Sequence, residues 1–266
     1  MSTNSHLHSI QDIFFACNED KYIATEHFIP EHGLSHIYSG EVTVTELDKS
    51  YTLRAGDTVL FARNQLAKFV KHPGKDEPFR SAAIFFRRPF LQKYYTEHRP
   101  LSIKESLKNL YFSKEPLVDS LFASLRPYSE LTSLPQELID IKIQEAITIL
   151  RSLDKRTDAI LGTFGEPGKI DLADFMQRNY TFNISLQQFA YLSGRSLATF
   201  KRDFQKVFHT SPQRWLSERR LKQAHFLIAE HKQKPSDVYL EVGFENLSHF
   251  SASFKQMFGY NPSSIA

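Results

Sequence analysis

The stretch Gly243-Phe-Glu-Asn-Leu-Ser-His-Phe-Ser-Ala-Ser-Phe-Lys-Gln-Met-Phe-Gly259, followed by Asn261-Pro262, decides the fold of the last third of this chain. After the first glycine and the polar Asn246, phenylalanine returns every four residues, at Phe250, Phe254 and Phe258. Side chains four residues apart share one face of a helix, so the pattern predicts a helix with a buried face. Glycine accepts a positive φ without steric cost, which suits a tight turn before that helix. A helix, such a turn and a second helix form a helix-turn-helix, whose second helix enters the DNA major groove.

The same unit occurs about fifty residues earlier. Gly194 and Ser196 precede Phe200, Phe204 and Phe208, and Ser211-Pro212 follows. Apolar residues between the two copies predict a connecting helix from about 212 to 230, about 28 Å long at about 1.5 Å per residue. That length is close to one DNA turn of about 34 Å. The repeat therefore predicts two recognition helices in successive major grooves, and the alternative is a plain helical bundle that happens to repeat.

Residues 170–266 resemble the AraC/XylS family of bacterial transcription regulators, most densely in the segment from Gly243 to Pro262. The resemblance implies a cytoplasmic bacterial regulator, usually an activator, with seven helices in its DNA-binding domain and RNA polymerase as a partner. Two residues depart from the family pattern. Ala252 stands where many members carry an arginine that contacts DNA, and Tyr239 stands where a small alanine is usual, which suggests altered packing near the turn.

The expected DNA contacts flank the two rows of phenylalanine, where side chains can meet base edges or phosphates. In the first recognition helix they are Arg195, Ser196, Thr199, Lys201, Arg202 and Gln205. In the second they are Asn246, Leu247, Ser248, His249, Ser251 and Lys255. For each of them, the alternative is an ordinary solvent-facing residue.

Length and charge favour two domains. A chain of 266 residues exceeds the usual size of a single domain. Its net charge is +3, and residues 170–266 hold 12 Lys/Arg against 8 Asp/Glu, which leaves residues 1–169 slightly acidic. The positive charge therefore lies in the part that is expected to meet phosphate.

The segment 1–153 is expected to form a regulatory and dimerisation domain that is β-rich at first. Largely alternating apolar residues near Val42 and Val44 predict a strand, and further strands are expected near 58–62, 67–71 and 81–87. The pattern Gly40-Glu-Val-Thr-Val with Leu53-Arg-Ala-Gly-Asp57 resembles the cupin-type barrel that precedes many AraC-family DNA-binding domains. The predicted class is thus α+β, a cupin-like β-barrel with helices followed by an all-α domain with two helix-turn-helix motifs. The expected lining or core of the barrel is Phe28, Ile37, Val42, Val44, Leu53, Val59, Phe61 and Phe85.

Helices are expected at the end of this domain. Apolar residues at helical spacing continue over about four turns at Ile139, Ile143, Ala146, Ile147, Leu150 and Leu153. A stripe of that length must be buried, either on the barrel or in a homodimer formed through 136–153. The segment 154–169 is rich in charge and glycine and is the expected linker.

No catalytic or metal site is expected. His27, His32 and His36 are four or five residues apart, whereas metal-binding cupins place two histidines one residue apart, so these three are expected at the surface or in loops. The sequence contains no glycine-rich phosphate loop and no nucleophile elbow. The single Cys17 excludes an internal disulfide and lacks the neighbours of a reactive thiol. We expect no cofactor, no membrane segment and no secretory signal near the N-terminus.

These patterns predict a sequence-specific DNA-binding transcription regulator, an activator controlled through its N-terminal domain by a small-molecule effector. Three alternatives remain: a protein partner in place of the small molecule, a repressor in place of an activator, and a cupin enzyme fused to a DNA-binding domain. The interior of the barrel bears on the first of these, because a cavity of about 300 Å³ or more favours a small ligand, whereas a filled interior favours a protein partner or no ligand.

Overall fold

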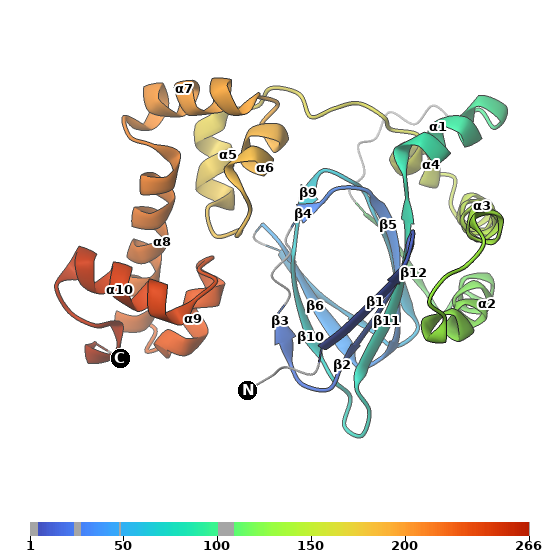
Figure 1. The fold of residues 1–266 in the computed structure, drawn as a ribbon, viewed down its shortest axis with the longest axis horizontal. Helices are drawn as coiled ribbons and strands as arrows, with labels where there is room; N and C mark the ends of the chain where they lie inside the picture. The colour runs from blue at the N-terminus through green and yellow to red at the C-terminus, as the bar shows by residue number, and fades with distance from the viewer. Residues whose placement is uncertain (1–4, 24–27, 48, 101–108, 266) are drawn as a thin grey trace. The chain divides into compact units, whose positions relative to one another are not determined.

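The computed structural model describes residues 5–23, 28–47, 49–100 and 109–265 (Figure 1). The chain divides between residues 165 and 166 into two compact units. We name them the N-terminal unit, which contains 1–24 and 29–165, and the C-terminal unit, which contains 166–266 and with which Phe28 is grouped. The first is β-rich and the second is helical, so the predicted α+β class is confirmed. None of the described helices has both the length and the apolar composition that crossing a membrane requires.

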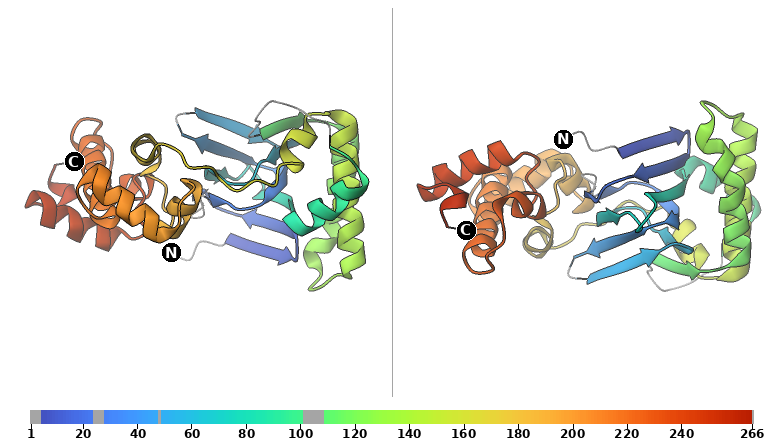
Figure 2. Two further views of the ribbon diagram at one scale, coloured as in Figure 1. Left: turned by 90° about the horizontal axis from the view of Figure 1, so that it is seen from above. Right: turned by 90° about the horizontal axis from the view of Figure 1, so that it is seen from below.

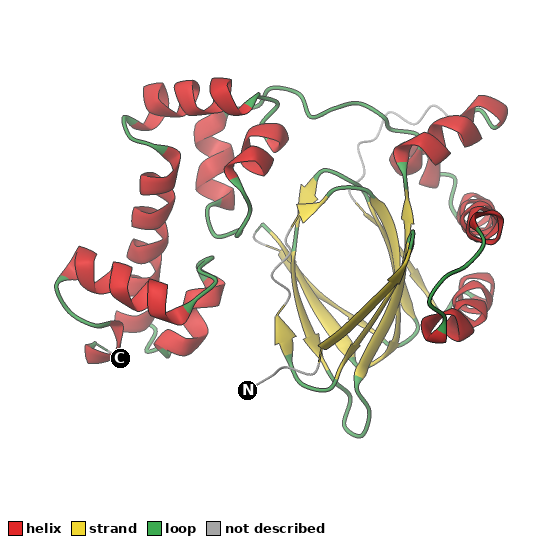
Figure 3. Ribbon diagram, viewed as in Figure 1, coloured by secondary structure: helices red, strands yellow, loops and turns green. Residues whose placement is uncertain are grey.

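Two sheets form most of the N-terminal unit. One has six strands in the order β1-β2-β11-β5-β8-β12, and the other has four in the order β3-β10-β6-β7, while β4 pairs with β9. The strands expected near 42–47, 58–62, 67–71 and 81–87 are β6, β8, β10 and β11. The bounds are β1 Ser5–Ile10, β2 Ile13–Asn18, β3 Tyr22–Ile23, β4 Phe28–Ile29, β5 His32–Ser39, β6 Glu41–Glu46, β7 Lys49–Arg54, β8 Asp57–Phe61, β9 Gln65–Leu66, β10 Lys68–His72, β11 Phe79–Phe86 and β12 Asn109–Ser113. The strands curve around an interior (Figure 3), but within the described residues they remain separate sheets and do not close into one hydrogen-bonded barrel.

The interior between the sheets is packed with apolar side chains. Six of the residues expected there belong to one buried cluster, namely Ile37, Val42, Val44, Leu53, Val59 and Phe61. Alternation along the strands explains this, because successive side chains point to opposite faces of a sheet. The other two expected members, Phe28 and Phe85, are only half-buried.

Among the described residues, four α-helices and one 3₁₀ helix complete this unit. They are α1 Arg88–Glu97, α2 Pro116–Leu125, the 3₁₀ helix η1 Arg126–Glu130, α3 Gln136–Leu153 and α4 Thr157–Leu161. The helices α2 and α3 lie side by side and share a core with the six-stranded sheet (Figure 2). The predicted stripe from Ile139 to Leu150 is at most 1% exposed within this core, whereas Leu153 is 36% exposed. The stripe therefore packs on its own unit and is not free to pair with a second copy.

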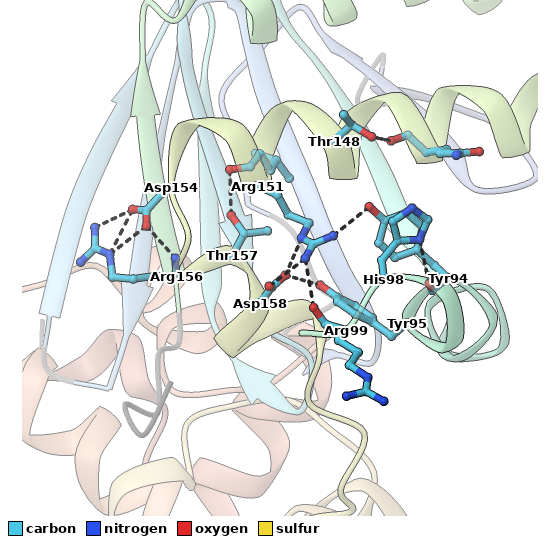
Figure 4. A network of polar contacts seen from close by, with 12 residues as sticks. Tyr94, Tyr95, His98, Arg99, Thr148, Arg151, Asp154, Arg156, Thr157 and Asp158 are labelled. Atoms are coloured by element: carbon cyan, nitrogen blue, oxygen red, sulfur yellow. Dashed lines mark hydrogen bonds and ion pairs between the residues drawn. The ribbon is translucent and has the colours of Figure 1, made fainter. Parts of the chain in front are cut away.

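Polar contacts attach α4 to the rest of the N-terminal unit (Figure 4). The Arg151 guanidinium lies 2.9 Å from the carboxylate of Asp158, which is 4% exposed, and the Tyr95 hydroxyl donates to the same carboxylate at 2.8 Å. The predicted linker 154–169 thus contains a buried helix that the sequence analysis did not predict. Only residues 162–171 lie between α4 and the next helix without helix or strand.

The histidine prediction needs correction. His32 and His36 lie in β5 and are 3% and 6% exposed, so they are neither at the surface nor in a loop. His36 Nδ1 is 2.7 Å from Thr58 Oγ1, and its ring stacks on Phe122 at 4.7 Å. Burial lowers the pKa of His32 to about 4, so this imidazole is neutral at physiological pH. His27 lies outside the described residues, within which no three His, Cys, Asp or Glu side chains gather in a way that could hold a metal ion.

The C-terminal unit contains six α-helices and one 3₁₀ helix in its described residues, in line with the seven that the resemblance implies. They are α5 Leu172–Asn179, α6 Leu186–Leu192, α7 Leu197–Phe208, α8 Pro212–Ala229, α9 Pro235–Glu241, α10 Leu247–Phe258 and η2 Pro262–Ser264. The predicted connecting helix is α8. One apolar cluster joins α5, α6 and α7 to the start of α8, and another joins α9 and α10 to its end.

Candidate nucleic-acid interface

Both predicted turns require glycine. Gly194, between α6 and α7, has φ +69°, and a Cβ there would lie 2.3 Å from the backbone of Gly168. Gly243, between α9 and α10, has φ +95°, and a Cβ there would lie 2.7 Å from the carbonyl oxygen of Thr181. Positive φ and close backbone approach therefore exclude larger residues from both turns.

The helices α7 and α10 match each other residue by residue. They begin fifty positions apart, at Leu197 and Leu247, and each has 12 residues. Ser196 caps α7 by accepting from the Thr199 amide, and Asn246 caps α10 by accepting from two amides, as side chains with an oxygen do at helix starts. Both helices end at a left-handed residue, so each position on one has a counterpart on the other.

The rows of phenylalanine form the buried faces. Phe200 and Phe204 on α7, and Phe250 and Phe254 on α10, are 0% exposed. Burying one face of each helix leaves the opposite face available for DNA.

The free face of α7 carries three cations. Among the expected contacts, Lys201, Arg202 and Gln205 are exposed and Thr199 is half-buried. Lys206 and Ala198, which were not among the expected contacts, are exposed on the same helix. The helical spacing that predicted the others would have found both.

Arg195 has another role. Its side chain is 6% exposed, lies 3.1 Å from the Asp203 carboxylate, and donates to the carbonyl oxygens of Ile170 and Ser193. The hydrogen bond from Arg195 holds the pKa of Asp203 below its usual range. The Arg195 side chain therefore stabilises the turn between α6 and α7 from within the protein. Because it is almost fully buried, it does not fit the DNA contact that was predicted for it.

The free face of α10 carries shorter side chains and one cation. Among its predicted contacts, Leu247, Ser248, His249 and Lys255 are exposed and Ser251 is half-buried, while Asn246 is exposed at the cap. Ala252 and Gln256, which were not predicted, are exposed as well. Ala252 is the counterpart of Arg202, so the two recognition helices differ most at this position.

One half-buried arginine on α8, which was not among the predicted site residues, links the segment before α6 to the second turn. The Arg220 guanidinium donates to the carbonyl oxygens of Tyr180 at 2.7 Å and Phe182 at 2.8 Å, which precede α6. It also donates at 2.9 Å to the carbonyl oxygen of Gly243 in the second turn. Burial lowers the pKa of Arg220 to about 10, so the side chain stays charged at neutral pH. Near it, the Asn183 amide donates to the Glu245 carboxylate at 2.7 Å, a second link between the motifs.

Comparison with known proteins agrees with this geometry. Residues 190–266 match a helix-turn-helix domain family, and residues 32–160 match the ExsA N-terminal regulatory domain family. The chain is 28% identical over 243 residues to the virulence regulon transcriptional activator VirF of Yersinia enterocolitica, covering 88% of both chains. It is 27% identical over 247 residues to the HTH-type transcriptional regulator ExsA of Pseudomonas aeruginosa, covering 88% of this chain and 85% of the relative. The structure of ToxT from Vibrio cholerae aligns with 99% of this chain and 96% of its own, at 17% identity and a TM-score of 0.42. The chain belongs to the AraC/XylS family of DNA-binding transcriptional regulators.

Proposed function

We propose that this protein activates transcription from sites at which α7 and α10 occupy successive major grooves. The supporting observation is that α7 and α10 match each other and pack against opposite ends of one connecting helix, α8. At about 1.5 Å per residue, α8 is about 27 Å long, and successive major grooves on one face repeat after about 34 Å. Activation is favoured over repression because the relative VirF is a transcriptional activator.

The helices α7 and α10 differ in the base contacts that they can make. Arg202 on α7 can make two parallel hydrogen bonds to guanine, the commonest specific arginine contact, and Lys201 and Lys206 beside it favour phosphate. At the counterpart position on α10, Ala252 offers only a methyl group, which suits the methyl of thymine. We therefore expect the first half of the site to require a G·C pair and the second half to depend on thymine and on DNA shape.

The N-terminal unit supplies regulation in this proposal, and it is not catalytic. Its match to a regulatory domain family supports that role, and the signal comes from a small ligand or from a protein partner. RNA polymerase is the expected partner of the DNA-bound form, and the cytoplasm is the expected compartment. A homodimer, if formed, must use a surface other than the buried stripe of α3.

Selection of bound duplexes from a random pool, followed by footprinting, tests the DNA proposal. The full chain should protect two consecutive major grooves and select a G·C pair in one half-site. Protection of a single groove, or equal affinity for all sequences, would contradict the proposal.

Arg202→Ala tests the assignment of the guanine contact. The variant should lose about 1–3 kcal/mol of binding to the selected site and lose the preference for G·C there. If Arg202 touches only phosphate, affinity should fall on every sequence, and the salt dependence should weaken by about one counterion. Arg54→Ala is the matched control, because Arg54 is an exposed arginine of the N-terminal unit and should leave DNA binding unchanged.

A further inference from the structure

A cleft of about 550 Å³ opens on the N-terminal unit between η1 and neighbouring strands of the six-stranded sheet. Its strand residues come from β1, β2, β5 and β11, which lie next to one another at one end of that sheet (Figure 1). A volume of this size falls within the range of small-molecule sites, about 300–1,000 Å³. The cleft is separate from the packed interior between the two sheets.

Most polar groups in the wall of the cleft already have partners. The Tyr38 hydroxyl donates to the Phe122 carbonyl at 2.7 Å, and the Ser39 hydroxyl donates to the Pro78 carbonyl at 2.6 Å. The Ser129 hydroxyl donates to the carbonyl of Arg126 within η1. These hydrogen bonds hold the hydroxyl groups in place. The charged side chains are then the groups that can form ion pairs with a ligand.

Two arginines and two glutamates face the cleft. They are Arg80, Arg126, Glu77 and Glu130, and within the described parts of the chain none of the four is engaged in an ion pair. The guanidinium of Arg126 lies over the Tyr38 ring, 4.7 Å from its centre, so the ring helps to hold it in place. Arg80 stands on β11 between Cys17 and Ser39 of the neighbouring strands. Both arginines thus lie on regular elements, whereas Glu77 lies in the turn before β11.

We propose that this cleft binds a small zwitterion with an apolar side chain, of the class of amino acids and short peptides. A carboxylate matches the planar donors of Arg80 and Arg126, and an ammonium matches Glu77 and Glu130. A plain anion or a plain cation leaves two of the four charges unpaired. The apolar part of the ligand packs on Phe15 and Tyr38, which also line the cleft.

The bound ligand would join η1 to the sheet. Because η1 continues directly from α2, whose other face packs in the core with α3, occupancy of the cleft would favour one arrangement of these helices. This consequence rests on the proposed regulatory role of the N-terminal unit, whereas binding itself does not require DNA.

Cys17 makes the test direct, because it lines the cleft and is the only cysteine of the chain. The rate at which a maleimide dye labels Cys17 in the full chain therefore reports on occupancy. Three probes with the same ring separate the charge requirements: phenylalanine, 3-phenylpropionate, which lacks the ammonium, and phenethylamine, which lacks the carboxylate. We expect phenylalanine to slow labelling in a saturable manner and the other two to do so only at higher concentration.

Arg80→Gln and Arg126→Gln should remove the protection by phenylalanine, whereas Arg54→Gln, outside the cleft, should keep it. A rise of the thermal midpoint with phenylalanine concentration, lost in the same two variants, gives a second readout that does not depend on the thiol. Absence of both effects, equal effects of the three probes, or protection that survives both substitutions would overturn the proposal. DNA affinity measured without probe separates the two proposals, because the cleft variants should bind DNA as the natural chain does.

Discussion

Three backbone carbonyls accept hydrogen bonds from the half-buried guanidinium of Arg220, two from the segment before α6 and one from the turn between α9 and α10. Arg220→Met keeps the length of the side chain but leaves these acceptors without a donor, so we expect a loss of about 2–4 kcal/mol in the free energy of unfolding. Arg214→Met on the same helix is the matched control. That side chain is 75% exposed and its pair with Glu218 is an ordinary surface pair, so the change should cost less than about 1 kcal/mol. Urea unfolding of both variants measures the difference. Equal losses in the free energy of unfolding would show that the contacts of Arg220 contribute no more to stability than a surface ion pair.

Acid should destabilise the N-terminal unit through His32. The pKa of the buried ring is lowered to about 4, whereas the unfolded chain binds this proton near pH 6.5. Because the unfolded state binds the proton more readily, the stability is fully present above about pH 6.5 and is lost as the pH falls toward 4, up to about 3 kcal/mol. In His32→Gln, unfolding of the N-terminal unit should depend less on pH over this window. Parallel stability curves for the two proteins would assign the acid sensitivity to other groups.

The residues whose roles were missed have partners that are distant in the sequence. Arg220 bonds to carbonyls 38 and 40 positions earlier, and His36 stacks on Phe122 from another element. Spacing along the chain contains no information about such contacts. Arg195 was misplaced for the same reason, because its charge and its position beside the turn fit a DNA contact equally well until its partners are known.

At the scale of elements, the sequence predicted what depends on local order. The glycine of each turn, the polar cap and the four-residue spacing of phenylalanine all act within about one helix, so α7, α8 and α10 were predicted. The bounds expected for α8, about 212 to 230, agree with Pro212–Ala229. The helix α3 was predicted too, but its partner was not, since an apolar stripe has the same pattern whether it meets its own sheet or a second copy. The helix α4 was missed because its five residues lie in a segment whose glycine and charge favour a linker.

The buried rows on α7 and α10 should control DNA binding indirectly. Phe204→Ala and Phe254→Ala each remove a side chain that is 0% exposed, and each should cost about 3–5 kcal/mol of stability. Specific DNA affinity should fall with the folded fraction, because the recognition helix loses its support. Val207→Ala is the control, since Val207 lies on α7 with Phe204 but is 46% exposed, so its truncation should change stability little. Normal thermal midpoints in both phenylalanine variants would show that these rows are not the buried faces.

Across the whole molecule, the basic residues are unevenly distributed between the two units. The excess of basic residues lies in 170–266, where α7 presents three cations and α10 presents one. The same unit connects its two recognition helices through α8 and the contacts of Arg220, so we expect their separation to be fixed.

A fixed separation predicts how the protein responds to the spacing of its two half-sites. Inserting about 5 base pairs between them turns the second half-site by about half a turn, so only one recognition helix can then engage. Inserting about 10 base pairs restores the same face but adds about 34 Å, which a helix of about 27 Å cannot span, so affinity should stay low. Mobility-shift titrations of the three duplexes measure this, with the same insertions outside the site as controls that should leave affinity unchanged. Recovery of full affinity with the longer insertion would mean that the two recognition helices are not rigidly joined, since only a connection that extends could reach both grooves.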